Sequence, residues 1–211
     1  MVVSDGFSVY DHRTVRMFDP DSKELTRRPL HEGDVAPMWT YLDWMMSPGS
    51  NSAASMLQKH LTVLSHDSSD YPVSLDEERR FFSDTSRKQL SEIFADVIQT
   101  PITRNGLDLE QIRQGSFFTR GGKQRVGGPS SYATAGSLIQ FSVKMEQGQL
   151  VDDWSSLELK RLLYITERRI RYGSSGALRS SALYFKSGSL YSWRKRKASP
   201  ARSITVTNAT I

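Results

Sequence analysis

The 211-residue chain contains no cysteine and only four histidines. Without cysteine it can form no disulfide, no thiolate metal site and no thiolate nucleophile, which excludes several kinds of chemistry at once. It also lacks a run of about 20 apolar residues, the length that spans a membrane, and its first residues do not resemble a signal peptide. We therefore expect no transmembrane segment and an intracellular location, in the cytoplasm, the nucleus or both, and not a secreted protein.

Apolar residues are also scarce. They make up 37% of the chain, against roughly 45 to 50% in typical globular proteins on a count that includes glycine. We therefore expect a substantial share of loop. The length suits one globular domain over residues 1–189, followed by a basic, flexible tail over residues 190–211.

What the chain does have is a reversal of charge along its length. Residues 1–103 hold 10 Lys and Arg against 16 Asp and Glu, a net charge of −6, whereas residues 104–211 hold 18 against 7, a net charge of +11. The globular domain thus divides into an acidic half, 1–103, and a basic half, 104–189. Because clustered cations attract phosphate or anionic lipid at long range, this asymmetry predicts a polyanionic partner.

In the acidic half, turn residues and apolar spacing predict short strands and three helices. The strands are expected within residues 7–18. One helix is expected to begin with Asp34 as its cap and to stop at Pro48, and the next spans residues 52–64. The third begins at a capping box at Ser74 and runs to Pro101.

In the basic half, residues 107–112 suggest a short helical turn, and residues 115–129 contain too many glycines for a regular helix. Residues 137–145 alternate in polarity and are interpreted as a strand that pairs with the N-terminal one. A capping box at Ser155 predicts a helix that runs to Tyr172, and residues 177–185 suggest a last short helix or strand. The predicted fold is α+β but mostly helical, with four or five helices, a small antiparallel sheet and the basic tail.

The predicted helix that ends at Tyr172 has one strongly basic face. Arg161, Tyr164, Arg168 and Arg171 follow at helical spacing, and Arg169 lies beside them. Arginine binds phosphate oxygens bidentately and an aromatic ring can stack on an unstacked base, so this face suits nucleic acid. The alternative is an ordinary solvated face in which Arg171 pairs with Glu167.

The glycine-rich segment offers a second candidate site, with Arg120, Lys123 and Arg125 between its glycines. Glycine lets backbone N–H groups approach an anion closely. The segment is not a P-loop, because Gln124 stands where that motif needs a hydroxyl residue. The alternative is a mobile surface loop, and the adjacent Phe117 and Phe118 could either stack on bases or anchor the loop to the core.

The tail is the third candidate. Its basic run, Arg194-Lys195-Arg196-Lys197, is typical of nuclear-import signals and nucleic-acid patches. Ser199-Pro200 follows directly, and phosphorylation there would weaken a phosphate contact. The alternative is a disordered tail that only increases solubility.

The histidines complete the set of candidates. His60 and His66, with Asp67 and Asp70 nearby, could in principle form a metal site or an acid–base pair, but their spacing matches no familiar site. The Gly-x-Ser-x-Gly elbow of serine hydrolases is also missing. We therefore expect no catalytic residues, no metal and no cofactor, and a protein that is not an enzyme.

Together these patterns predict a non-enzymatic nucleic-acid-binding protein, with RNA favoured over DNA. Contacts from Lys and Arg would read the backbone, as in a nucleocapsid, packaging or silencing-related protein. The opposite charges of the two halves would also permit head-to-tail self-association into a homo-oligomer. The alternative is a matrix-like structural protein that binds an anionic membrane surface, or a protein partner, through the same cations with Tyr191 and Trp193.

Overall fold

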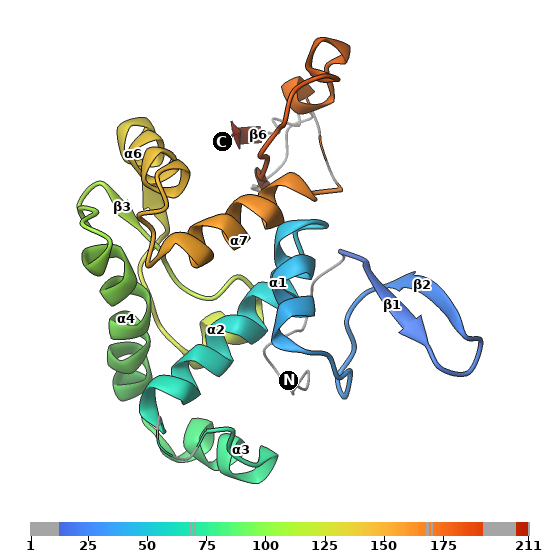
Figure 1. The fold of residues 1–211 in the computed structure, drawn as a ribbon. Helices are drawn as coiled ribbons and strands as arrows, with labels where there is room; N and C mark the ends of the chain where they lie inside the picture. Colours follow the sequence, from blue (N-terminus) through green and yellow to red (C-terminus); the bar gives the residue numbers. More distant parts are fainter. Residues whose placement is uncertain are drawn as a thin grey trace, which may run out of the picture.

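The computed structural model describes residues 13–67, 69, 71–167, 169, 171–191 and 206–210. This part of the chain forms an α+β fold that is mostly helical, as the sequence predicted (Figure 1). It contains seven α-helices, where four or five were expected, and three separate pairs of antiparallel strands.

The bounds of the elements are as follows. The α-helices are α1 (Met38–Met46), α2 (Asn51–His66), α3 (Leu75–Asp84), α4 (Arg87–Arg104), α5 (Arg120–Arg125), α6 (Ala135–Glu146) and α7 (Asp153–Tyr164). Strand β1 (Val15–Asp19) pairs with β2 (Glu24–Arg28), β3 (Ile112–Arg113) with β4 (Tyr132–Ala133), and β5 (Ser187–Tyr191) with β6 (Val206–Thr210). Two 3-10 helices, Arg171–Ser174 and Gly176–Leu178, follow α7.

Helix α2 passes through the middle of the molecule, between α1 and α4 (Figure 1). Small residues such as Ala53 and Ser55 line its early turns and are fully buried, which lets neighbouring elements approach its backbone. The larger of two apolar clusters surrounds it and includes Tyr41, Met56 and Phe94. A second, smaller cluster lies between the end of α1 and helices α6 and α7; its buried members are Met46, Met145, Leu150, Leu162 and Leu163.

The capping box at Ser74 is confirmed, because its hydroxyl accepts from the N–H of Glu77 and the Glu77 carboxylate accepts from Ser74 N. The single helix predicted from there to Pro101 is wrong. Helix α3 ends at Asp84, and a second capping box, formed by Ser86 and Gln89, starts the separate helix α4. Pro101 does not stop α4, which continues to Arg104 although a proline inside a helix loses its own N–H hydrogen bond and crowds the carbonyl four residues before it.

The strand predicted over residues 137–145 is also wrong, because these residues lie in α6. Their apolar alternation fits a helix equally well: Phe141 and Met145, four residues apart, face the smaller cluster, while Ile139 and Val143 face solvent. The missed signal is Thr134, which caps α6 in a box with Ser137. The N-terminal strand therefore pairs with β2 and not with this segment.

The helices α1 and α7 do not begin at the residues that the sequence predicted. Asp34 does not cap α1, because the N-cap residue is Pro37. The Asp34 carboxylate instead accepts two hydrogen bonds of 2.7 Å from the Arg28 guanidinium. Helix α7 begins after Asp152, which accepts from Ser155 N at 2.6 Å, so the box predicted at Ser155 is one turn late. It ends at Tyr164 and not at Tyr172.

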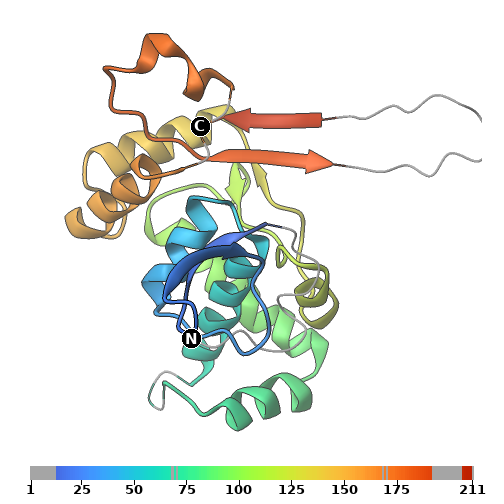
Figure 2. The same cartoon turned by 90° about the vertical axis from the view of Figure 1, so that its right-hand side faces the viewer.

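Three further segments also differ from their predicted structure. The glycine-rich residues 115–129, expected to contain no regular helix, include the short helix α5. Residues 177–185, predicted as a last short helix or strand, contain the end of the 3-10 helix Gly176–Leu178 and are otherwise irregular. Strand β5 begins three residues before the predicted tail and pairs with β6 inside it, so the flexibility expected of the tail is not confirmed (Figure 2).

Candidate nucleic-acid interface

The glycine-rich segment is held firmly against the core. The ring of Phe117 is fully buried and lies 4.7 Å from the ring of Phe94 on α4, centroid to centroid. The buried hydroxyl of Ser55 on α2 accepts hydrogen bonds from the N–H groups of Phe118 (3.1 Å) and Thr119 (2.9 Å). The alternative of a loose surface loop therefore does not describe this segment. Phe117 serves as its anchor, whereas the ring of Phe118 stays partly exposed.

Two glycines allow α5 to sit where it does. A Cβ on Gly122 would lie 2.6 Å from side-chain atoms of Phe117, so only glycine permits the helix to rest on that ring. A Cβ on Gly127 would lie 2.9 Å from the Oγ of Ser91 on α4, which accepts the Gly127 N–H at the same distance. The glycines thus serve close packing between α5, its following turn and α4.

This packing brings the basic first turn of α4 against the backbone of the basic helix α5. Nη2 of Arg87, in the first turn of α4, donates to the carbonyl oxygen of Lys123 on α5 at 3.3 Å. Beside this contact lies a groove of about 530 Å³, whose lining includes Arg87, Lys88 and Gly127. Arg87 and Lys88 are exposed, as are the three cations of α5, Arg120, Lys123 and Arg125.

The groove lining carries a net charge of +1, from two cations, Arg87 and Lys88, and one carboxylate. Its one acidic lining residue is Glu92, whose carboxylate lies 3.9 Å from Lys88 Nζ on an exposed surface. Arg87 and Lys88 also occupy the first two positions of α4, at the positive end of the helix dipole, where each cation costs about 0.3 to 1 kcal/mol. A bound anion would offset both the dipole and the mutual repulsion of the cations. We call Arg87, Lys88, Arg120, Lys123 and Arg125 the α4–α5 cation cluster.

Sequence reasoning selected the α5 cations and missed those of α4. Arg87 and Lys88 lie in the acidic half of the chain, where they are outnumbered by carboxylates. The one local signal was their position directly after the Ser86 cap, where helices favour acidic residues instead.

The predicted basic face of α7 is not brought together as one face. Because the helix ends at Tyr164, the helical spacing does not extend to Arg168 and Arg171; the backbone of Arg171 lies in a 3-10 helix, and Arg168 falls outside the described residues. Arg161 stacks on the ring of Trp39 at 4.3 Å and pairs with Glu158 at 3.1 Å.

The neighbouring residues are also engaged within the fold. Arg169 lies 5.6 Å from the ring centroid of Tyr164 and donates to its carbonyl oxygen at 2.7 Å. Glu167, the partner proposed for Arg171, forms ion pairs with Arg16 (3.1 Å) and Arg27 (2.7 Å) of the first hairpin. The end of α7 therefore keeps a net positive charge, with four arginines against Glu158 and Glu167, but each of these four arginines is engaged within the fold.

The outer face of α7 carries exposed apolar side chains around Arg161. Trp154 and Leu157 are 69% and 60% exposed, and Tyr164 continues the same stripe seven residues beyond Leu157. Exposed apolar side chains grouped in this way are typical of an interaction surface.

The histidines serve the core and surface of the α2–α3 region. His60 is buried beside Glu78, with 3.7 Å between Nδ1 and Oε2, and Glu78 also forms a buried ion pair with Lys59. Burial, together with the Lys59 ammonium, lowers the pKa of His60 to about 4. His66 stacks on Phe81 at 4.7 Å. No three His, Asp or Glu side chains in the described ranges are grouped to hold a metal, and Asp70 lies outside those ranges.

The basic run Arg194-Lys195-Arg196-Lys197, together with Trp193 and Ser199, lies outside the described residues. Among the helices that the structure describes, none has the length and hydropathy that a membrane crossing needs. Comparisons with protein-family models, with curated proteins and with solved structures find no match to this chain.

Proposed function

We propose that this protein is a non-enzymatic nucleic-acid-binding protein that holds the backbone of RNA at the α4–α5 cation cluster. The observation that carries the proposal is the hydrogen bond from the Arg87 guanidinium to the backbone carbonyl of Lys123, 36 positions away, which holds the first turn of α4 against the basic helix α5. The adjacent groove is lined by Arg87, Lys88 and one carboxylate. Phosphate is the ligand that such a set of guanidinium and ammonium groups suits best. The cations on and around α7 and in the tail, including Arg168 and Arg194 to Lys197, would extend the contact.

Contacts of this kind predict weak base preference and steep salt dependence, because they neutralise phosphates and release counterions. Single-stranded RNA is the favoured ligand. Phe118, next to α5, exposes part of its ring, and exposed aromatic rings suit the unstacked bases of single strands.

Fluorescence anisotropy with labelled single- and double-stranded RNA and DNA across a salt series tests the proposal. The double variant Arg87→Ala/Lys123→Ala should weaken binding and reduce the slope of log affinity against log salt by about 1.4, at about 0.7 per phosphate contact for a single strand. The matched control is Arg79→Ala/Arg80→Ala on α3, which removes the same charge elsewhere and should leave the slope unchanged. A wild-type protein that binds no nucleic acid near physiological salt would overturn the proposal.

Self-association belongs to the same proposal, because a protein that packages RNA coats it in many copies. The exposed apolar face of α7, around Trp154 and Leu157, supports it beside the opposite charges of the two halves of the chain. The alternative, a matrix-like protein on an anionic membrane or a protein partner, uses the same cations. Vesicles of neutral lipid with and without phosphatidylserine, added to the same assay, distinguish it from RNA binding.

A further inference from the structure

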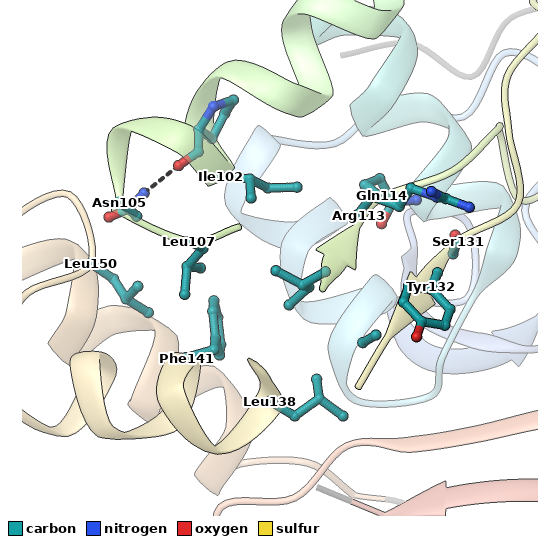
Figure 3. Close-up of a pocket in the computed structure, with 13 residues that line it drawn as sticks. Ile102, Asn105, Leu107, Arg113, Gln114, Ser131, Tyr132, Leu138, Phe141 and Leu150 are labelled. Atoms are coloured by element: carbon teal, nitrogen blue, oxygen red, sulfur yellow. Dashed lines mark hydrogen bonds between the residues drawn. The ribbon is translucent and has the colours of Figure 1, made fainter. Parts of the chain in front are cut away.

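A second cavity lies at the other end of α4 from the cation cluster. It measures about 560 Å³ and is bounded by the end of α4, the β3–β4 pair and α6. Figure 3 shows apolar side chains from these elements around one space. They are Ile102, Leu107, Ile112, Leu138, Phe141 and Leu150. A cavity of this size and lining is within the range of sites for small organic molecules.

The rim of the cavity is polar and aromatic. The guanidinium of Arg113 on β3 lies 5.5 Å from the ring centroid of Tyr132 on β4, and this ring is 47% exposed. Gln114, which follows Arg113, has a buried Nε2 with no hydrogen-bond partner in the structure. The amide of Asn105 holds the end of α4, because it donates to Pro101 O and accepts from Val151 N, both at 2.7 Å.

The cavity and the cationic groove lie on one face of α4. Ser91 and Ala95 line the groove, and Ile102 lines the cavity. These positions are four and seven residues apart, which places them on the same side of a helix with 3.6 residues per turn. At 1.5 Å per residue, Ser91 and Ile102 are about 16 Å apart along the axis. A short stretch of single strand can therefore reach from one to the other.

We propose that this cavity receives an unstacked base of the RNA strand whose phosphates lie in the cationic groove. The inference rests on the proposed function and adds a base-binding site to it. A base is planar and apolar on its faces, so its faces would contact the apolar lining while its polar edge stays at the polar rim. Tyr132, with Arg113 on its ring, provides a stacking surface at the entrance. An acyl chain would make no use of this stacking surface.

The test compares two labelled RNA oligonucleotides of equal length, one with all its bases and one with several internal abasic positions. Both keep the same phosphates, so the cation cluster binds them alike. Stacking of a base on an aromatic ring is worth about 1 to 3 kcal/mol, so the wild-type protein should prefer the complete oligonucleotide by about 5- to 150-fold.

The variants separate the two sites. Leu138→Trp fills the cavity, and Tyr132→Ala removes the stacking surface; each should reduce the preference for bases and leave the salt slope unchanged. Ile139→Trp makes the same change one residue along α6, where the side chain is 65% exposed, and should behave as wild type. Thermal denaturation confirms that each variant is folded. Arg87→Ala/Lys123→Ala should instead lower the salt slope and keep the preference.

The outcomes are distinguishable. Equal binding of complete and abasic RNA by the wild-type protein, with a steep salt slope, would overturn the base site and leave the proposed function standing. An undiminished preference in both Leu138→Trp and Tyr132→Ala would place base recognition elsewhere and overturn the inference. No binding of either oligonucleotide would overturn both the function and the site.

Discussion

Protonation of one buried histidine should make this fold sensitive to mild acid. His60 lies in α2 with its Nε2 buried and without a hydrogen-bond partner, and its Nδ1 lies 3.7 Å from the Glu78 carboxylate that Lys59 already engages. Burial, and then the Lys59 ammonium, lower the pKa of His60 from 6.5 to about 4. Between these pH values the unfolded chain binds a proton at His60 and the folded protein does not. The folded state therefore loses stability as the pH falls from 6.5 towards 4.

The size of the effect follows from the shift. Each pH unit in this interval costs about 1.4 kcal/mol, so the free energy of unfolding should fall by about 3 kcal/mol over the whole interval. That is a large share of the roughly 5 to 15 kcal/mol that stabilises a domain. Hydrogen bonds lower the pKa of Glu77 and Asp152, but these acids titrate mainly below about 4.5 in the unfolded chain, so the upper part of the window belongs to histidine.

Urea denaturation at pH 7, 6, 5 and 4.5 measures this fall in the free energy of unfolding, with His60→Gln as the variant and His66→Gln as its control. The wild-type protein and His66→Gln should lose stability in parallel, because both retain the buried His60. His60→Gln should show a much flatter dependence on pH, since glutamine does not titrate. The reasoning is refuted if His60→Gln retains the wild-type slope.

Three further perturbations test the packing and the assembly. Lys59→Met should destabilise the fold by about 3 to 5 kcal/mol, because it leaves the buried Glu78 carboxylate unpaired; adding a neutral residue at Glu78 should recover much of the loss in urea denaturation. Gly122→Ala places a Cβ 2.6 Å from Phe117, so it should displace α5, lower the melting temperature and weaken RNA binding together. Leu157→Glu places a charge in the exposed apolar face of α7, so it should reduce the mass measured by light scattering at low salt; an unchanged oligomer would exclude that face from assembly.

The features that sequence predicted well are those that depend on near neighbours. The start of α3 at the Ser74 box and the course of α2 over residues 51–66 follow from contacts within four positions. Prediction failed where one pattern fits two structures. The apolar alternation of residues 137–145 satisfies both a strand and α6, and Pro101 is tolerated inside α4 although it usually ends a helix.

The residues of the candidate site were likewise predicted only in part from the sequence. The cations of α5 were visible as a basic, glycine-rich segment, but their partners on α4 were hidden in an acidic stretch of sequence. The Arg161 and Tyr164 pair was predicted as part of a long basic face, which the end of α7 interrupts. The predicted basic face required α7 to continue to Tyr172, so the end of the helix at Tyr164 removes the regular spacing of its residues.

By itself, the amino-acid sequence determined the charge reversal, the absence of thiol chemistry, the predominance of helix and the start of α3 at the Ser74 box. Only the tertiary structure decided that Arg87 meets Lys123, and that Ile102, Arg113 and Leu138 surround one cavity. The physical reason is the separation along the sequence of the residues that interact. A cap is satisfied by hydrogen bonds between close neighbours in the chain, whereas these meetings depend on burying residues such as Phe117 against Phe94, far away in sequence.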